Sequence, residues 1–146
     1  MKVMVIIKTT GADEGALAPS QEMFEAMTAY NEQLVKAGIM LDGDGLKPSS
    51  AGAQVVFERG ETSVVDGPFT ESKEIVAGYW VWQVSSLEEA IEWVKRCPTD
   101  PAVGQRGVIE VRPFVEAADF GDAYTPELQE REARLAEQIE AQQSGA

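Results

Sequence analysis

The chain has no histidine, a single cysteine and few basic residues, and each shortage excludes a class of function. Without histidine there is no Ser-His or Cys-His pair, no His-ligated zinc or haem, and no imidazole acid or base. The lone cysteine, Cys97, excludes an intrachain disulfide and favours a reducing compartment. We therefore predict a protein that needs no metal, haem or other cofactor.

Positive charge and long apolar runs are also scarce. Twelve Lys and Arg stand against 25 Asp and Glu, so the formal net charge is −13. Because nucleic acids and anionic membranes are bound largely through Lys and Arg, we predict neither as a partner. The N-terminal apolar run over residues 3–7 is too short for a signal-peptide core or a membrane span, which predicts a cytoplasmic protein.

The pattern that is present predicts an α+β domain in a chain of 146 residues. Helices are expected after Ser20, Ser86 and Thr125, which are typical N-cap residues. The expected strands cover residues 2–8, 39–46, 54–58, 62–65, 75–84 and 108–115. Without the hairpin of residues 54–65, the order is the βαββαβ of a ferredoxin-like sheet, followed by a C-terminal helix.

The strand at residues 75–84 is apolar on both faces, which predicts a homodimer. Trp80, Trp82 and Val84 alternate with Tyr79 and Val81. A ferredoxin-like sheet carries its helices on one face only, so one of these apolar faces needs another cover. A second copy packed sheet to sheet would cover this face, because a twofold interface uses the same patch on both copies. The C-terminal helix either reaches across to the partner or covers its own sheet.

Five segments carry a resemblance to a known family. They read GDGLKPSS (43–50), DGPFTESKE (66–74), AGYWVWQV (77–84), EEAIEWVKRCP (88–98) and EVRPF (110–114). Over about residues 1–116 the chain resembles the DGPF-motif branch of the YCII-like family. The resemblance implies a YCII-like domain over residues 1–116 and a helical extension over 117–146. It also implies a dimeric α+β barrel, in which two sheets pack face to face and enclose pockets.

The same resemblance implies mostly uncharacterised proteins, some of them linked to sigma factors. Distant relatives are similar to muconolactone-processing enzymes, for which a His-Asp pair has been proposed as the active site. This chain has no histidine, so that pair cannot be transferred to it.

The segment 66–74 is the strongest candidate for chemistry. Asp66 is a candidate acid/base, and Thr70 is expected to cap a short helical turn whose N–H groups, with Lys73, attract an anion. The remaining candidate ligand-binding residues are Ser72, Tyr79, Trp80 and Arg112. The alternative is that 66–74 is a structural loop, that Trp80 and Trp82 pack under a helix, and that Arg112 pairs with Glu110.

Two further features receive a structural interpretation. Asp42 and Asp44 suggest a calcium loop, but the fifth and twelfth positions of that template are Leu46 and Ala53, so no metal site is predicted. Cys97 follows two basic residues and has no partner base, so a buried structural thiol is expected.

Two functions remain open at this point. The first is a small-molecule-binding homodimer, acting as a cofactor-free enzyme if Asp66 is catalytic, with its pocket between the two sheets. The second is a non-catalytic interaction or regulatory module that partners a transcription factor without contacting DNA.

Overall fold

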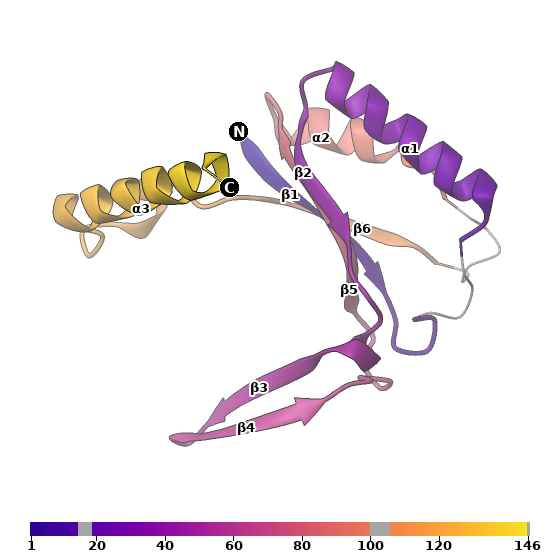
Figure 1. Ribbon diagram of the computed structural model, residues 1–146, viewed down its shortest axis with the longest axis horizontal. Helices are drawn as coiled ribbons and strands as arrows, with labels where there is room; N and C mark the ends of the chain where they lie inside the picture. Colours follow the sequence, from indigo (N-terminus) through magenta and orange to yellow (C-terminus); the bar gives the residue numbers. More distant parts are fainter. Residues whose placement is uncertain (15–18, 100–105, 146) are drawn as a thin grey trace. The chain divides into compact units, whose positions relative to one another are not determined.

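The computed structural model describes residues 1–14, 19–99 and 106–145 (Figure 1). They fall into two compact units, Met1–Phe114 and Val115–Ala146. The first unit contains β1 (Lys2–Thr9), α1 (Gln21–Lys36), β2 (Met40–Gly45), η1 (Ser49–Ala51), β3 (Ala53–Glu58), β4 (Glu61–Asp66), β5 (Ile75–Gln83), α2 (Leu87–Val94) and β6 (Val108–Pro113). The second contains η2 (Ala117–Phe120) and α3 (Pro126–Ser144).

Local capping explains where the two helices of the first unit begin. The Ser20 hydroxyl accepts a hydrogen bond from the Met23 N–H at 3.1 Å, and the Ser86 hydroxyl does the same for Glu89 at 3.1 Å. Both predicted N-caps are confirmed. After α1, Gly38 adopts a φ of 74°, a left-handed conformation that ends the helix at little steric cost.

Four strands form one antiparallel sheet in the order β2-β5-β1-β6. This is the strand order of a ferredoxin-like fold, so the predicted α+β class is confirmed. Figure 1 shows α1 and α2 on the same side of the sheet. The β3–β4 hairpin forms a separate two-stranded sheet, as its insertion into the βαββαβ pattern predicts.

The core lies between this sheet and the two helices. Trp80 and Trp82 are buried in it, and their tilted rings pack against each other with centroids 5.7 Å apart. The Trp80 indole N–H donates to the Asn31 side chain at 2.9 Å, which satisfies its one polar group. Val3, Val5, Tyr30, Leu34, Ile39, Val84 and Ala90 complete the buried cluster. The tryptophan pair therefore packs under a helix, as the structural interpretation predicted.

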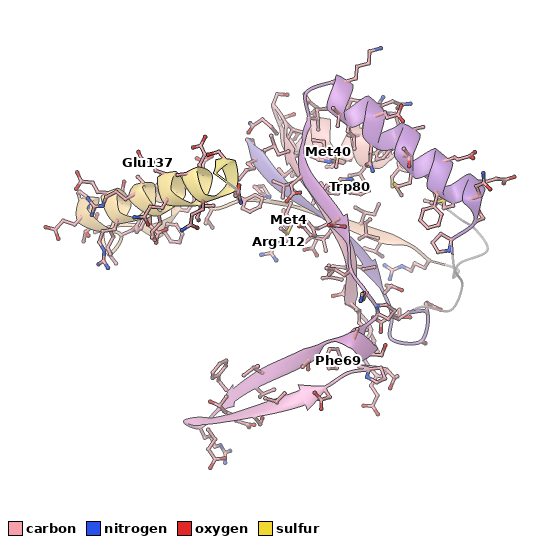
Figure 2. The ribbon with its side chains drawn as sticks, viewed as in Figure 1. Met4, Met40, Phe69, Trp80, Arg112 and Glu137 are labelled. Atoms are coloured by element: carbon pink, nitrogen blue, oxygen red, sulfur yellow. The ribbon has the colours of Figure 1, made fainter. Side chains whose placement is uncertain are left out.

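The opposite face of the sheet carries no helix of the first unit. We call it the helix-free face. Register places Met4, Ile6, Tyr79 and Val81 together on it, each half-buried. Figure 2 shows Met4 and Arg112 on this side of the sheet and Trp80 on the side of the helices.

The second unit is mostly one helix. The Thr125 hydroxyl accepts from the Leu128 N–H at 3.3 Å, which confirms the predicted start of α3. The sequence predicted a frayed end from Gln142 to Ala146, but the helix continues to Ser144. None of its residues is buried. Within the three described ranges, no helix combines the length and apolarity needed to cross a bilayer.

Candidate functional site

The predicted site residues of the segment 66–74 lie in a tight connection between β4 and β5. Asp66 is the last residue of β4, where it pairs with Ala53 and is exposed. Its carboxylate accepts no hydrogen bond from any described residue, so it does not organise the loop as an acceptor of N–H groups.

The predicted helical turn at Thr70 is wrong. Thr70 and Glu71 form a hydrogen-bonded turn in which the Ser72 N–H donates to the Phe69 carbonyl at 3.0 Å. This bond uses the Ser72 N–H, and no backbone hydrogen bond among the described residues uses the N–H of Thr70 or Glu71. Attraction of an anion by this turn and Lys73 stays a prediction. Lys73 is exposed and makes no ion pair within residues 1–14, 19–99 and 106–145.

The loop instead packs closely on the end of β1. The Gly11 N–H donates to the Ser72 carbonyl at 2.8 Å. A β-carbon on Gly11 would lie 2.5 Å from the carbonyl oxygens of Phe69 and Thr70, so only glycine fits there. Ser72 also donates its hydroxyl to the Glu74 carbonyl at 2.9 Å. The polar groups of Ser72 therefore serve the backbone.

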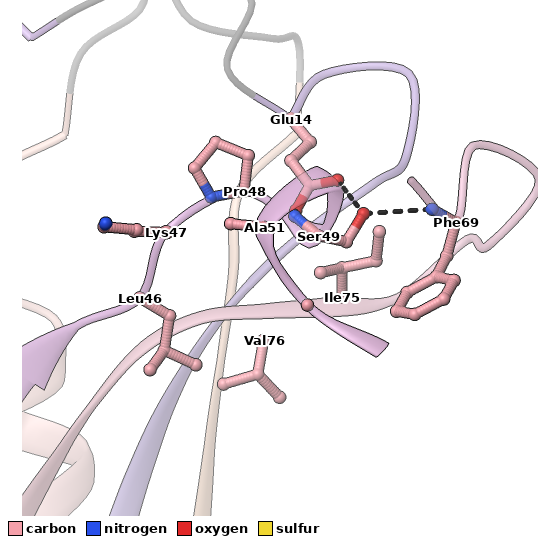
Figure 3. Close-up of a pocket in the computed structure, with 10 residues that line it drawn as sticks. Glu14, Leu46, Lys47, Pro48, Ser49, Ala51, Phe69, Ile75 and Val76 are labelled. Carbon is pink, nitrogen blue, oxygen red and sulfur yellow. Dashed lines mark hydrogen bonds between the residues drawn. The ribbon is translucent and has the colours of Figure 1, made fainter. Parts of the chain in front are cut away.

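Ser49 joins three loops beneath this segment (Figure 3). Its hydroxyl donates to the Glu14 carboxylate at 2.6 Å and accepts from the Phe69 N–H at 3.0 Å. The second Glu14 oxygen accepts from the Ser49 N–H. Ser49 is a buried polar residue of the described chain, and every polar group on its side chain is used.

Sequence reasoning did not identify Ser49 or Glu14 as important. The only signal for Ser49 was its place in the segment GDGLKPSS, which carried the family resemblance. Glu14 gave no signal, because one carboxylate in a Gly- and Ala-rich loop of an acidic chain looks like any other.

A hollow of about 320 Å³ lies beside this junction, open to solvent. Leu46, Pro48, Ala51, Phe69, Ile75 and Val76 give it an apolar wall, and Glu14, Lys47, Ser49 and Gly52 also line it. Of the candidate segment 66–74, only Phe69 reaches this wall. Val76 lies opposite Lys8 in the β1–β5 ladder, which places the hollow at the Lys8 end of the sheet.

A group of charges occupies the helix-free face at the same end. Lys8 donates to Glu110 at 2.8 Å and lies 3.3 Å from the Glu74 carboxylate. The Arg112 guanidinium lies 3.8 Å from Glu110, so the predicted Glu110–Arg112 pairing is present. The hydrogen bond from Lys8 lowers the pKa of the Glu110 carboxyl, and the same bond raises the pKa of Lys8.

The candidate residues therefore separate into three places. Tyr79 and Arg112 share the helix-free face, whereas Trp80 is in the core on the other side of the sheet. Asp66, Thr70, Ser72 and Lys73 lie in the loop. The structure does not gather them into one site.

The side chains of Asp42 and Asp44, which suggested a calcium loop, bond to neighbouring backbone groups in the described structure. The Asp42 and Asp44 carboxylates accept from the N–H groups of Gly43 and Gly45 at 2.8 and 2.9 Å. Among the residues with described coordinates, no three His, Cys, Asp or Glu side chains are grouped to hold a metal ion. Cys97 is half-buried, and burial raises the pKa of its thiol to about 11.

Comparison with known proteins gives two findings. A family model described as the YCII-related domain matches residues 1–118. An uncharacterised protein of Rhizobium meliloti (strain 1021) is 32% identical over 95 residues, which covers 64% of this chain and 74% of that relative.

Proposed function

This chain belongs to the YCII-related domain family, and we propose that it is a homodimer that binds a small, largely apolar molecule in the hollow beside Ser49. Lys47 lines this hollow, and we expect it to pair with an anionic group of that molecule. The observation that carries the proposal is the apolar hollow itself, next to a junction of three loops that hydrogen bonds hold in place.

The size and lining of the hollow support this proposal. Small-molecule sites commonly have volumes of roughly 300–1,000 Å³, apolar walls and a few polar groups. Here the polar groups of Ser49 and Glu14 are bonded to each other, which leaves Lys47 as the charged group available to a ligand. Since the whole chain carries a formal charge of −13, an anionic ligand depends on such a local cation.

The helix-free face supports the homodimer. Met4, Ile6, Tyr79 and Val81 form its apolar centre, and charged side chains of β2 and β6 surround them. A second copy packed on this face buries the apolar centre with one self-complementary patch.

Binding does not require catalysis by Asp66. This residue does not line the hollow, and the loop around it lacks the helical turn that we expected to stabilise negative charge. A catalytic role for Asp66 stays a separate hypothesis with its own test.

Thermal melting with a fragment library tests the proposal. We expect small apolar carboxylates to raise the melting temperature of the parent, because a ligand that binds only the native state stabilises it. Val76→Phe fills the hollow and removes this shift, whereas Val35→Phe on the exposed side of α1 keeps it. Lys47→Ala weakens the binding of carboxylates and leaves the binding of their neutral analogues unchanged. Shifts that survive Val76→Phe, or no shift with any fragment, contradict the proposal.

An interaction module is the second candidate, and α3 is the observation that favours it. Leu128, Leu135 and Ile139 form one stripe on this helix, and each is at least 39% exposed. A helix with an exposed apolar stripe suits a groove on another protein. Deleting residues 117–146 and testing for loss of a bound partner, including a sigma factor, separates this function from ligand binding in the first unit.

A further inference from the structure

The wall of the hollow holds a carboxylate that belongs to the protein itself. Glu14 lines the hollow, and its two oxygens accept from two donors of one residue, the Ser49 N–H and the Ser49 hydroxyl, the latter at 2.6 Å. Figure 3 shows the Glu14 side chain reaching Ser49 from another loop. Hydrogen bonds to an ionised acceptor are roughly twice as strong as neutral ones. Ser49 therefore offers a pair of donors suited to a carboxylate, beside an apolar wall.

Glu14 reaches Ser49 from a short turn that follows β1. The Glu14 N–H donates to the Thr10 carbonyl at 3.0 Å, and the adjacent Asp13 accepts from the Thr10 hydroxyl at 2.8 Å. Within the described residues, the Glu14 carboxylate has hydrogen bonds to Ser49 alone. The Glu14 side chain is half-buried and lies next to a hollow that opens to solvent. Rotation of this one side chain is therefore enough to release the donors of Ser49, and no strand or helix has to move.

A carboxylate on a ligand can take the place of Glu14 without a net loss of hydrogen bonds. The donors are the same, the new acceptor has the same chemistry, and water hydrates the released Glu14 carboxylate. The two carboxylates cannot share the donors, because like charges at such short range repel each other. Lys47 lines the same hollow, and no ion pair links it to another described residue. Lys47 and the apolar wall both favour the ligand in this exchange.

We propose that Ser49 binds the carboxylate of the ligand, and that Glu14 is a built-in competitor for the same two donors. The inference rests on the ligand site proposed above. It adds the residue that recognises the carboxylate and the residue that limits the affinity. Because the ligand has to displace Glu14, its apparent affinity is reduced to the fraction of molecules in which Ser49 is accessible. A neutral ligand that does not use Ser49 meets no such competition.

Binding of benzoate and of its neutral analogue benzamide tests the competition. Glu14→Ala removes the competitor, so benzoate binds about 10- to 100-fold more tightly, as expected if Ser49 is accessible in roughly 1–10% of parent molecules. Benzamide binds the parent and the variant equally. Asp13→Ala is the matched control, because Asp13 is the adjacent carboxylate and bonds to Thr10. This control leaves both affinities unchanged in calorimetric titrations.

The Ser49 amide proton reports the exchange directly in NMR spectra. In the parent, the hydrogen bond to the Glu14 carboxylate shifts the signal of this proton downfield. Glu14→Ala moves the signal upfield, and saturating benzoate returns it toward its parent position, whereas benzamide does not. Glu14→Gln is a second variant with a smaller effect on folding, because its amide oxygen still accepts from the Ser49 N–H. Its neutral side chain competes less well, so benzoate binding tightens by a smaller factor than in Glu14→Ala.

The failure of this proposal can be told apart from the failure of the ligand site. If both probes bind the parent and are lost in Val76→Phe, but neither Glu14 variant tightens benzoate binding, the ligand site stands and Glu14 is only a structural partner of Ser49. Tighter benzoate binding without the return of the Ser49 amide signal also overturns the exchange at Ser49. If neither probe binds any of these proteins, the competition is overturned, and the fragment screen described above decides separately on the ligand site.

Discussion

Gly67 lies so close to Ser49 that a β-carbon on Gly67 would stand 1.7 Å from the Ser49 carbonyl oxygen. The neighbouring atom belongs to the backbone, so no side-chain rotation can relieve the contact. Residues 66–69 read Asp-Gly-Pro-Phe, and this contact explains why a glycine fits the second position.

Gly67→Ala is therefore expected to lower the free energy of unfolding by about 1–3 kcal/mol, as at other overpacked positions. Gly45→Ala is the matched control, because a β-carbon there meets no atom within 4 Å. It should change stability by less than about 0.5 kcal/mol. Urea denaturation of both variants measures the difference, and equal stabilities would show that the 66–74 loop moves freely away from Ser49.

Local patterns were enough to predict most of the fold. Ser20, Ser86 and Thr125 cap helices through N–H groups three residues away, so a short window of sequence contains the whole interaction. The alternation of Trp80 and Trp82 with Tyr79 likewise assigned these residues to opposite faces of β5. These contacts need no knowledge of distant residues.

The junction at Ser49 could not be predicted in the same way. Its partners Glu14 and Phe69 are 35 and 20 residues away in the chain, and no periodic pattern joins three loops. The helical turn expected at Thr70 failed for a related reason. The turn from Phe69 to Ser72 and the contact with Gly11 fix that backbone, and both depend on tertiary packing.

Ser49→Ala tests the importance of the junction. Removing the hydroxyl leaves the Phe69 N–H and one Glu14 oxygen without their partner, and an unsatisfied buried group costs about 1–3 kcal/mol. Ser50→Ala is the control, since Ser50 is exposed and adjacent. The melting temperature of Ser49→Ala should be several degrees below that of Ser50→Ala. A melting temperature for Ser49→Ala equal to that of Ser50→Ala would mean that water replaces the hydroxyl.

Asp66→Asn tests whether the loop has a catalytic carboxylate. Because the Asp66 side chain is exposed and accepts no hydrogen bond from described residues, the variant should keep its stability within about 0.5 kcal/mol. Ligand-induced shifts in melting temperature should also be retained, since Asp66 does not line the hollow. Loss of turnover or of every shift, with folding intact, would instead support the acid/base hypothesis.

Cys97 should react slowly in the folded protein. Burial raises the pKa of its thiol to about 11, so at pH 8 much less thiolate is present than in the unfolded chain. We expect alkylation by iodoacetamide to be roughly 10- to 100-fold slower than in urea-unfolded protein, as measured by mass spectrometry over time. The unfolded chain serves as the control for the intrinsic reactivity of the thiol. Equal rates in the two states would exclude a buried structural role.

The Lys8–Glu110 pair should make stability depend on pH in the acid range. The hydrogen bond from Lys8 holds the pKa of Glu110 below its ordinary value of 4.5, so the folded state binds a proton at this group less readily than the unfolded chain does. Its contribution to stability is therefore fully present above pH 4.5 and is lost as the pH falls through the folded-state pKa. Glu110→Gln removes the charge and should be less stable than the parent at pH 7. The difference in stability between the two proteins should become smaller toward pH 3.

Glu92→Gln is the control for this pH effect, because Glu92 pairs with Lys95 on the exposed surface of α2 and both side chains are about two-thirds exposed. Such a surface pair contributes little, so this variant should follow the parent at every pH. The Lys8 side chain, by contrast, is 16% exposed and contacts both Glu74 and Glu110. Denaturant titrations at pH 7, 5 and 3 compare the three proteins. When the parent carboxylate is protonated at low pH, only its charge interaction is lost. If the difference in free energy of unfolding between Glu110→Gln and the parent stayed constant from pH 7 to pH 3, the substitution would therefore act through packing and not through charge.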